Sequence, residues 1–184
     1  MRKTKNTDNS TKIIRGNTVI HNIDPVFDSE SKILILGSFP SVKSREAEFF
    51  YAHPRNRFWS VIAAVLECEK PETAQEKEAF LISNHIALWD VVYSCDICGS
   101  GDSSIRNVVP TDLKRIFKAA AIKAVYTNGS KAGELYRRYQ ERDTRMRAIV
   151  LPSTSPANAA WSPEKLCDAW QVIVSDRRQT DGTL

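Results

Sequence analysis

Apolar residues form four short, continuous runs along this chain, separated by longer segments with helical spacing. The runs lie at residues 32–37, 87–93, 123–127 and 148–151. A continuous apolar run of this length is typical of a strand that is buried on both faces of a parallel sheet. The sequence therefore predicts four parallel strands, the first of which ends at Gly37.

Between and after these runs, apolar residues recur at the three- and four-residue steps of an amphipathic helix. The segments with this spacing lie at residues 56–69, 72–83, 114–121, 130–142 and 163–174. Pro71 ends the first segment and Pro163 stands in the first turn of the last, both of which suit proline. The alternation predicts an α/β fold, a three-layer sandwich with a short central parallel sheet flanked by helices.

Length and composition favour one domain with a substantial core. The chain has 184 residues, of which 42% are apolar and 26% charged, an ordinary composition for a soluble domain. We expect this domain to span residues 18–176, between a mobile basic tail at 1–17 and a polar tail at 177–184. The chain contains no apolar run of about 20 residues and no apolar leader, so we expect no membrane contact.

The net charge of +4 is concentrated in the first tail. Residues 1–12 contribute +3, which leaves +1 for the remaining residues. The folded body is nearly neutral, so nucleic-acid binding would have to rest on local patches. The arginines between positions 137 and 147, including Arg142 and Arg145, form one such patch. The alternative is that they form a solvated helix face.

The four cysteines, Cys68, Cys95, Cys98 and Cys167, include a single CxxC pair. Such a pair can belong to a redox site, a zinc site or an iron–sulfur cluster. However, Cys68 and Cys167 fall in helical patterns, where a small buried thiol is common. We therefore expect no metal.

The segment YAHPRNRFW, from Tyr51 to Trp59, is the densest cluster of aromatic, amide and cationic groups. It follows the first predicted strand and its turn GSFPS, from Gly37 to Ser41. Ligands of α/β sheets bind at the carboxyl ends of parallel strands. Aromatic faces combined with a few polar groups suit a planar ligand. The sequence therefore predicts a nucleobase pocket.

The strings GSFPS, HPRNRFW and LPSTSPANA (residues 151–159) together resemble the uracil-DNA glycosylase superfamily. HPRNRFW is similar to a string of the mismatch-specific uracil-DNA glycosylases, and the combination is most similar to the hypoxanthine-DNA (deoxyinosine) glycosylase branch. The resemblance covers roughly residues 33–170. It implies a short parallel sheet between helical layers, in agreement with the pattern of runs.

For function, the resemblance implies a monofunctional DNA glycosylase of base excision repair. Such an enzyme flips a deaminated base out of DNA, hypoxanthine before uracil, and hydrolyses the N-glycosidic bond. The implied partner is DNA that contains such a base, and no cofactor is needed. We further expect a monomer located in the cytoplasm, associated with the nucleoid, or elsewhere inside the cell.

The resemblance also assigns roles to individual residues. Asn56 corresponds to the catalytically important asparagine of the deoxyinosine branch, where its amide would position the attacking water through its carbonyl. Alternatively, it only caps the helix that begins at Arg57. Tyr51 corresponds to the aromatic residue on which the flipped base stacks, with core packing as the alternative. Phe39 stands where many relatives carry an Asp or Asn for the water. The chain therefore either recruits another group or lacks base-excising activity.

Asp90 interrupts the second apolar run where a relative's base-reading asparagine would stand. Its carboxylate could accept the ring N–H of hypoxanthine or uracil and reject adenine and cytosine. The alternative is a structural bond to the backbone or to Arg55 or Arg57, because a carboxylate in an apolar strand needs a partner. His53 could assist the leaving base or be structural. The predicted base-binding residues are Gly37, Ser38, Phe39, Tyr51, His53 and Asp90.

The loop LPSTSPANAAW takes the place of the superfamily's second motif, which enters the duplex. Its serines could bind phosphates, and its small residues could wedge into the space of the flipped nucleotide. The predicted DNA-contacting residues are Ser153, Ser155, Ala157, Asn158, Arg142 and Arg145. The alternative is a Ser/Pro-rich turn that caps the last helix.

Two other functions stay open at this point. A nucleic-acid or nucleotide-binding module could keep the pocket without the chemistry, as Phe39 would permit. An enzyme that hydrolyses free nucleosides would use the same pocket without any dependence on a duplex.

Overall fold

The main sheet of the protein is parallel, with the strand order β3-β2-β6-β7. The computed structural model describes residues 18–98 and 102–175, so the tails expected at 1–17 and 177–184 lie outside the described residues. The strands are β2 (Ile33–Gly37), β3 (Ile86–Asp90), β6 (Ala124–Asn128) and β7 (Ala148–Leu151). In the register of the sheet, Gly37 lies beside Asp90.

Burial explains why β2 occupies a central position. All five of its residues are buried, and both of its edges pair with parallel neighbours. Each buried Leu or Ile side chain contributes about 1.5 to 3 kcal/mol to folding. The strand therefore anchors the core, and the turn that follows Gly37 starts from a rigid position.

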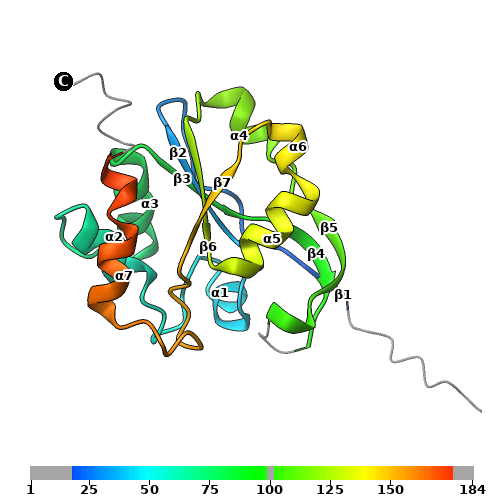
Figure 1. Ribbon diagram of the computed structural model, residues 1–184, viewed down its shortest axis with the longest axis horizontal. Helices are drawn as coiled ribbons and strands as arrows, with labels where there is room; N and C mark the ends of the chain where they lie inside the picture. Colours follow the sequence, from blue (N-terminus) through cyan, green and yellow to red (C-terminus); the bar gives the residue numbers. More distant parts are fainter. Residues whose placement is uncertain (1–17, 99–101, 176–184) are drawn as a thin grey trace, which may run out of the picture.

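Helices cover both faces of this sheet (Figure 1). Helices α2 (Phe58–Val65), α3 (Ala74–Ser83) and α7 (Pro163–Trp170) lie on one face, and α5 (Ser130–Tyr139) lies on the other. A capping box between Thr73 and Glu76 begins α3, and Ser162 caps α7. The predicted three-layer α/β sandwich is confirmed. Within the described residues, no helix is both long enough and apolar enough to cross a membrane.

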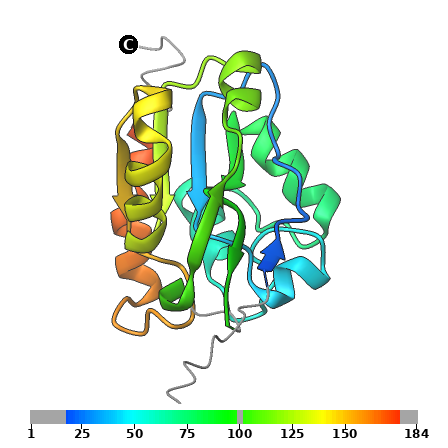
Figure 2. The same ribbon diagram turned by 90° about the vertical axis from the view of Figure 1, so that its right-hand side faces the viewer.

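A second, antiparallel sheet was not predicted. It consists of β1 (Thr18–Ile20), β4 (Val92–Asp96) and β5 (Arg106–Pro110), in the order β1-β4-β5, and it lies on the side of the molecule that faces the viewer in Figure 2. The single strand predicted at 87–93 is therefore wrong. Strand β3 ends at Asp90, the N–H groups of Val91 and Val92 bind the carbonyls of Gly37 and Ser38, and the chain then leaves for the second sheet.

The parallel strands all finish at one end of the sheet. Helix α1 (Val42–Glu46) and the loop between β7 and α7 lie together at this end, at the bottom of Figure 1. Helices α4 (Lys114–Ala119) and α6 (Glu141–Thr144) lie at the opposite end, where β6 and β7 begin. The helix predicted at 130–142 is thus divided at Gln140 into α5 and α6.

Candidate active site

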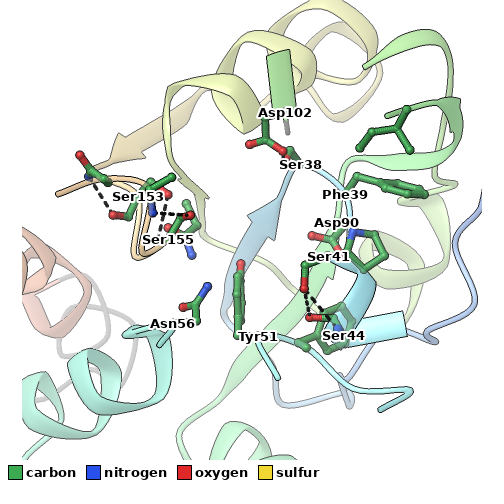
Figure 3. Close-up of a pocket in the computed structure, with 16 residues that line it drawn as sticks. Ser38, Phe39, Ser41, Ser44, Tyr51, Asn56, Asp90, Asp102, Ser153 and Ser155 are labelled. Atoms are coloured by element: carbon green, nitrogen blue, oxygen red, sulfur yellow. Dashed lines mark hydrogen bonds between the residues drawn. The ribbon is translucent and has the colours of Figure 1, made fainter. Parts of the chain in front are cut away.

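A cavity of about 420 Å³ opens at the carboxyl ends of β2, β3 and β6 (Figure 3). This is where α/β sheets bind ligands, and the volume lies within the range of small-molecule sites. The lining residues come from the turns after these strands, helix α1, the segment before α2, the position after β4, the loop after β7 and the 3₁₀ turn η1 (Asp102–Ser104). They are Ser38, Phe39, Pro40, Ser41, Ser44, Phe50, Tyr51, Asn56, Asp90, Ile97, Asp102, Asn128, Ser153, Ser155, Ala157 and Asn158.

Gly37 leaves room for two polar groups at the floor of the cavity. A Cβ atom added to this residue would lie 2.1 Å from Oδ1 of Asp90 and 3.1 Å from the hydroxyl of Tyr51. Any side chain would therefore displace the carboxylate. The glycine that ends the first strand is required for this close approach.

The ring of Tyr51 projects into the cavity from the segment before α2 (Figure 3). It stacks on Phe58, with the ring centroids 4.1 Å apart and the ring planes at 22°. Its backbone has a φ of 53°, a left-handed conformation that costs about 1 to 2 kcal/mol for a side chain of this kind. The packing of the Tyr51 ring on Phe58 thus stabilises a backbone conformation that is otherwise disfavoured, and it directs the ring towards the cavity.

The hydroxyl of Tyr51 is buried and has no hydrogen-bond partner in the described part of the chain. Burial, with the charge of Asp90 as a second cause, raises the pKa of Tyr51 well above its ordinary value. The Asn128 amide offsets part of this rise without reaching hydrogen-bonding geometry. The hydroxyl is therefore a protonated, unpaired polar group at the wall of the cavity.

Asn56 has its carbonyl oxygen fully engaged. Oδ1 accepts the backbone N–H of Phe58 at 2.9 Å and the hydroxyl of Thr154 at 3.0 Å. A carbonyl oxygen has two lone pairs, and both are used. The amide nitrogen therefore remains for a ligand, and it points into the cavity (Figure 3). Asn56 binds the N–H of the first residue of α2, although the N-cap position itself is held by Arg57. The expectation that the Asn56 carbonyl holds the water is not supported, because both of its lone pairs are used.

Thr154 connects Asn56 to the far wall. This residue is fully buried, and its hydroxyl accepts the amide N–H of Asn128 at 2.9 Å while its own backbone N–H donates to Oδ1 of Asn128 at 2.9 Å. Three segments that are distant in sequence are thus joined by one network of side-chain hydrogen bonds. Such a network of hydrogen bonds restricts the geometry of its members.

Arg57 holds the loop that follows β7. Its guanidinium donates to the carbonyls of Ser155 at 2.8 Å and Asn158 at 3.0 Å, and also to the carbonyl of Trp161. The five N–H donors of an arginine suit such a multidentate contact. The second arginine of the string HPRNRFW therefore fixes the loop that follows β7.

The serines of this loop keep a donor available. The hydroxyl of Ser153 accepts the backbone N–H of Ser155 at 3.2 Å, and that of Ser155 accepts the N–H of Ala157 at 3.3 Å. Each hydroxyl proton is left to donate outward. The amide of Asn158 donates to the carbonyl of Ser153 at 2.8 Å, so it is tied into the loop, whereas Ala157 is exposed.

A second carboxylate stands on the rim opposite Asn56 (Figure 3). Asp102 begins η1, and its Oδ1 accepts the hydroxyl of Ser38 at 2.9 Å. The residue as a whole is exposed, but its carboxylate lies over the cavity. Desolvation raises the pKa of Asp102 above its ordinary value, the charge of Asp90 adds to the rise, and the Ser38 hydrogen bond opposes it.

Asp90 has a histidine as its partner. Nε2 of His21 lies 3.0 Å from Oδ2 of Asp90, and both side chains are buried. The partners considered from the sequence, Arg55, Arg57 or the backbone, do not bind this carboxylate in the described residues. His21 is distant in sequence and precedes the predicted strands, so no local motif indicated it.

A family model described as the uracil DNA glycosylase superfamily matches residues 25–175 of this chain. The chain belongs to this superfamily. The resemblance carried by GSFPS, HPRNRFW and LPSTSPANA is thereby confirmed. Membership in the superfamily makes the chain a hydrolase of the DNA glycosylase type.

Relatives within the superfamily include two Methanosarcina proteins named hypoxanthine DNA glycosylase. The one from Methanosarcina acetivorans is 32% identical over 152 residues, which are 80% of this chain and 93% of the relative. The one from Methanosarcina barkeri is 33% identical over 112 residues, which are 60% of this chain and 71% of the relative.

A solved structure shares the fold. It is a solution NMR structure of a Methanosarcina acetivorans protein described as a candidate uracil DNA glycosylase. The superposition has a TM-score of 0.70 at 29% identity and covers 84% of this chain and 98% of that protein.

The structure brings most of the residues predicted for a superfamily site into one cavity. Those that line it are Ser38, Phe39, Tyr51, Asn56, Asp90, Ser153, Ser155, Ala157 and Asn158, and Gly37 supports its floor. His53 does not line it; its Nδ1 accepts the backbone N–H of Arg55 at 3.1 Å, which shapes the turn. The prediction that His53 binds the base has no support in this geometry.

Arg142 and Arg145 are not brought to the cavity either. Arg142 lies in α6 and Arg145 ends it, at the opposite end of the sheet. The helix after the loop is capped by Ser162, so the loop's own serines do not serve as that cap. The sequence assigned no role to His21, Asp102, Asn128 or Thr154. The loops at 100–107 and 127–130 do resemble loops at this end of the sheet in the deoxyinosine branch, but the four side chains act through contacts between segments far apart in the chain.

Within the part of the chain that the structure describes, the cysteines form no cluster with other metal-binding side chains. Cys68, Cys95, Cys98 and Cys167 are free thiols. Among the described residues, no group of three or more His, Cys, Asp or Glu side chains could hold a metal ion.

Proposed function

We propose that this superfamily member is a monofunctional DNA glycosylase that removes hypoxanthine, and secondarily uracil, from DNA. The base is flipped into the cavity and its N-glycosidic bond is hydrolysed, as a step of base excision repair. The observation that carries the proposal is the convergence of an aromatic face, an unpaired carboxylate oxygen and a free amide donor around one cavity. The names of the two Methanosarcina relatives support hypoxanthine as the base.

The base is bound by stacking on one face and by a hydrogen bond at one edge. The face of Tyr51 not covered by Phe58 offers a stacking surface worth about 1 to 3 kcal/mol per base. Oδ1 of Asp90 accepts N1–H of hypoxanthine or N3–H of uracil. Adenine and cytosine present an unprotonated ring nitrogen at that edge. This nitrogen and Oδ1 of Asp90 are both acceptors, so neither gains a hydrogen bond, at a cost of about 1 to 3 kcal/mol.

The attacking water requires one group that positions it and a second group that accepts its proton. The amide nitrogen of Asn56 can donate to the oxygen of a water and so position it, but an amide does not accept its proton. Besides Asp90, the only carboxylate among the lining residues is that of Asp102. We assign the proton to Asp102, whose charge also stabilises the oxocarbenium-like sugar. This carboxylate replaces the group that Phe39 lacks.

The loop after β7 contacts the DNA backbone in this proposal. The free hydroxyl protons of Ser153 and Ser155 bind phosphates beside the flipped nucleotide, and the exposed Ala157 approaches the vacated space. Arg57 holds the loop in place. Arg142 and Arg145, at the opposite end of the sheet, contribute only through long-range attraction.

A gel assay on duplexes with one deoxyinosine or one deoxyuridine, followed by alkali, tests the function. Strand cleavage after alkali, and none before it, supports a monofunctional glycosylase. Tight binding without cleavage supports the inert binding module. Release of base from free deoxyinosine, with no preference for the duplex, supports a nucleoside hydrolase.

A further inference from the structure

His21 supports the cavity from behind. It belongs to none of the segments that line the cavity, and its side chain is only 1% exposed. Aromatic rings surround it, with the centroids of Phe39 and Trp89 at 6.1 and 6.2 Å. Such a position is costly for an imidazole unless both ring nitrogens are paired.

Both nitrogens of His21 are paired, and the pairing fixes the tautomer. The backbone N–H of Ile23 donates to Nδ1 at 3.1 Å, so Nδ1 carries no proton. The ring proton is therefore on Nε2, which donates to Oδ2 of Asp90 at 3.0 Å. Because Nε2–H is a donor only, it binds an oxygen and no other atom of the residue at position 90.

The carboxylate of Asp90 is thereby oriented. Oδ2 is turned towards His21, and Oδ1 is turned towards Gly37 and the cavity. No donor from the described residues reaches Oδ1, and the atom is not closed off from the cavity. One oxygen is thus held behind the pocket wall and the other is presented to a ligand.

We propose that His21 is a positioning residue that sets the base specificity of the pocket. It fixes which atom of residue 90 faces the base, so the pocket presents an acceptor and selects bases that carry a ring N–H. The inference rests on the proposed glycosylase function and adds to it a residue that does not touch the substrate.

The variant Asp90→Asn makes the orienting effect measurable. With His21 in place, the amide oxygen faces Nε2–H and the amide nitrogen faces the cavity as a donor. The pocket then favours an unprotonated ring nitrogen. The ratio of excision rates for deoxyinosine over deoxyadenosine is expected to fall at least about tenfold relative to wild type, equivalent to about 1.4 kcal/mol.

The double variant His21→Leu, Asp90→Asn tests the orientation itself. Without the donor, the amide is free to turn its oxygen to the cavity, so the ratio is expected to move back towards deoxyinosine by at least about threefold. His21→Gln, Asp90→Asn is the matched control, because the glutamine amide again supplies a donor to residue 90. Thermal unfolding of each variant establishes that it is folded.

The same ratios are measured as dissociation constants by fluorescence anisotropy, which requires no chemistry. A ratio that is lowered by Asp90→Asn and restored by His21→Leu supports the inference in either assay. Equal ratios for the single and double Asp90→Asn variants would overturn it, since His21 would then be a packing residue. A wild type that binds deoxyinosine duplex selectively without cutting it overturns the glycosylase function and leaves the inference standing.

Discussion

The hydroxyl of Thr154 donates to Oδ1 of Asn56 at 3.0 Å, across 98 positions of sequence. This bond joins the loop after β7 to the start of α2, and it occupies the amide oxygen that a water would otherwise bind. It therefore determines which atom of Asn56 the cavity receives.

Replacing Thr154 by valine removes this bond at nearly constant volume. The change removes one of the two donors to Oδ1 of Asn56, which keeps only the N–H of Phe58, and the acceptor of Nδ2 of Asn128. The free energy of unfolding should therefore fall by about 1 to 3 kcal/mol. The single-turnover excision rate should fall at least about tenfold, because the Asn56 amide is no longer fixed. Thr154→Ser keeps the hydroxyl and should retain both the stability and the excision rate of the wild type. Equal losses in the two variants would show that the methyl group matters instead.

Asn56 itself is tested by two substitutions. Asn56→Ala removes the amide, and the excision rate should fall at least about tenfold. Asn56→Asp keeps an oxygen for Phe58 and Thr154 but replaces the donor by an acceptor, so it should lose the rate while retaining the capping interaction. Single-turnover kinetics and thermal unfolding separate the two effects. A wild-type rate in Asn56→Asp would remove the amide nitrogen from the mechanism.

Arg57 should matter for stability more than its neighbour Arg55. Arg57→Ala breaks hydrogen bonds to several loop carbonyls and should lower the free energy of unfolding by about 2 to 3 kcal/mol. Arg55 is exposed, and Arg55→Ala should change the free energy of unfolding by less than about 0.5 kcal/mol. Urea unfolding of the pair measures the difference. Similar free energies for the two variants would mean that the loop after β7 does not depend on the hydrogen bonds of Arg57.

Much of the fold follows from apolar patterning because the strands are short, buried and bounded by glycine or proline. The continuous apolar run at residues 32–37 predicts a strand, and the structure has β2 at Ile33–Gly37 with every position buried. The second sheet was missed because its strands are short and its side chains mix exposure and burial: Ile20 is 57% exposed and Tyr93 is 46% exposed. Neither periodicity nor composition distinguishes such strands from loops.

The site was only partly accessible from the sequence for a related reason. Tyr51, Asn56 and Asp90 stand in or beside recognisable strings, whereas His21 and Asp102 reach the cavity through the fold. The pairing of His21 with Asp90 spans 69 positions, and that of Ser38 with Asp102 spans 64. Contacts of this kind leave no local spacing signal. Arg142 and Arg145 illustrate the opposite error, since a basic run does not say at which end of the sheet it lies.

Tyr51 is predicted to act through its ring. Tyr51→Ala should weaken binding to a deoxyinosine duplex by about 1 to 3 kcal/mol. Tyr51→Phe should bind almost as well, and its free energy of unfolding should be equal or higher, because the buried hydroxyl has no partner in the described residues. Titration by fluorescence anisotropy compares the variants. Equal losses of affinity would assign the role to the hydroxyl.

Asp102 should cause the excision rate to fall at acidic pH, as an acid limb in the pH–rate profile. The ionised carboxylate accepts the proton, so the single-turnover rate should fall as the pH is lowered through the pKa of Asp102, which desolvation raises above the ordinary aspartate value. Asp102→Asn should be at least about tenfold slower at neutral pH and should lack this limb. An unchanged limb in Asp102→Asn would assign the titration to another group.

Stability provides the control for Asp102. Because its pKa is raised on folding, the ionised form disfavours the folded state above the unfolded pKa, and the effect disappears as the pH falls below that value. Asp102→Asn removes the charge and can still accept the Ser38 hydroxyl. Its thermal midpoint at neutral pH should therefore equal or exceed that of wild type, and a lower midpoint would indicate a structural role.

Release of free base under single-turnover conditions tests directly whether this protein is a hypoxanthine-DNA glycosylase. A duplex with one deoxyinosine is incubated with excess wild-type protein, and hypoxanthine and alkali-labile sites are quantified on the same sample by chromatography and gel. A monofunctional glycosylase releases one hypoxanthine for each abasic site and leaves the strand intact before alkali, and both products should be absent from a matched deoxyadenosine duplex. A duplex that is fully bound, as shown by anisotropy, but that releases no base would contradict the account.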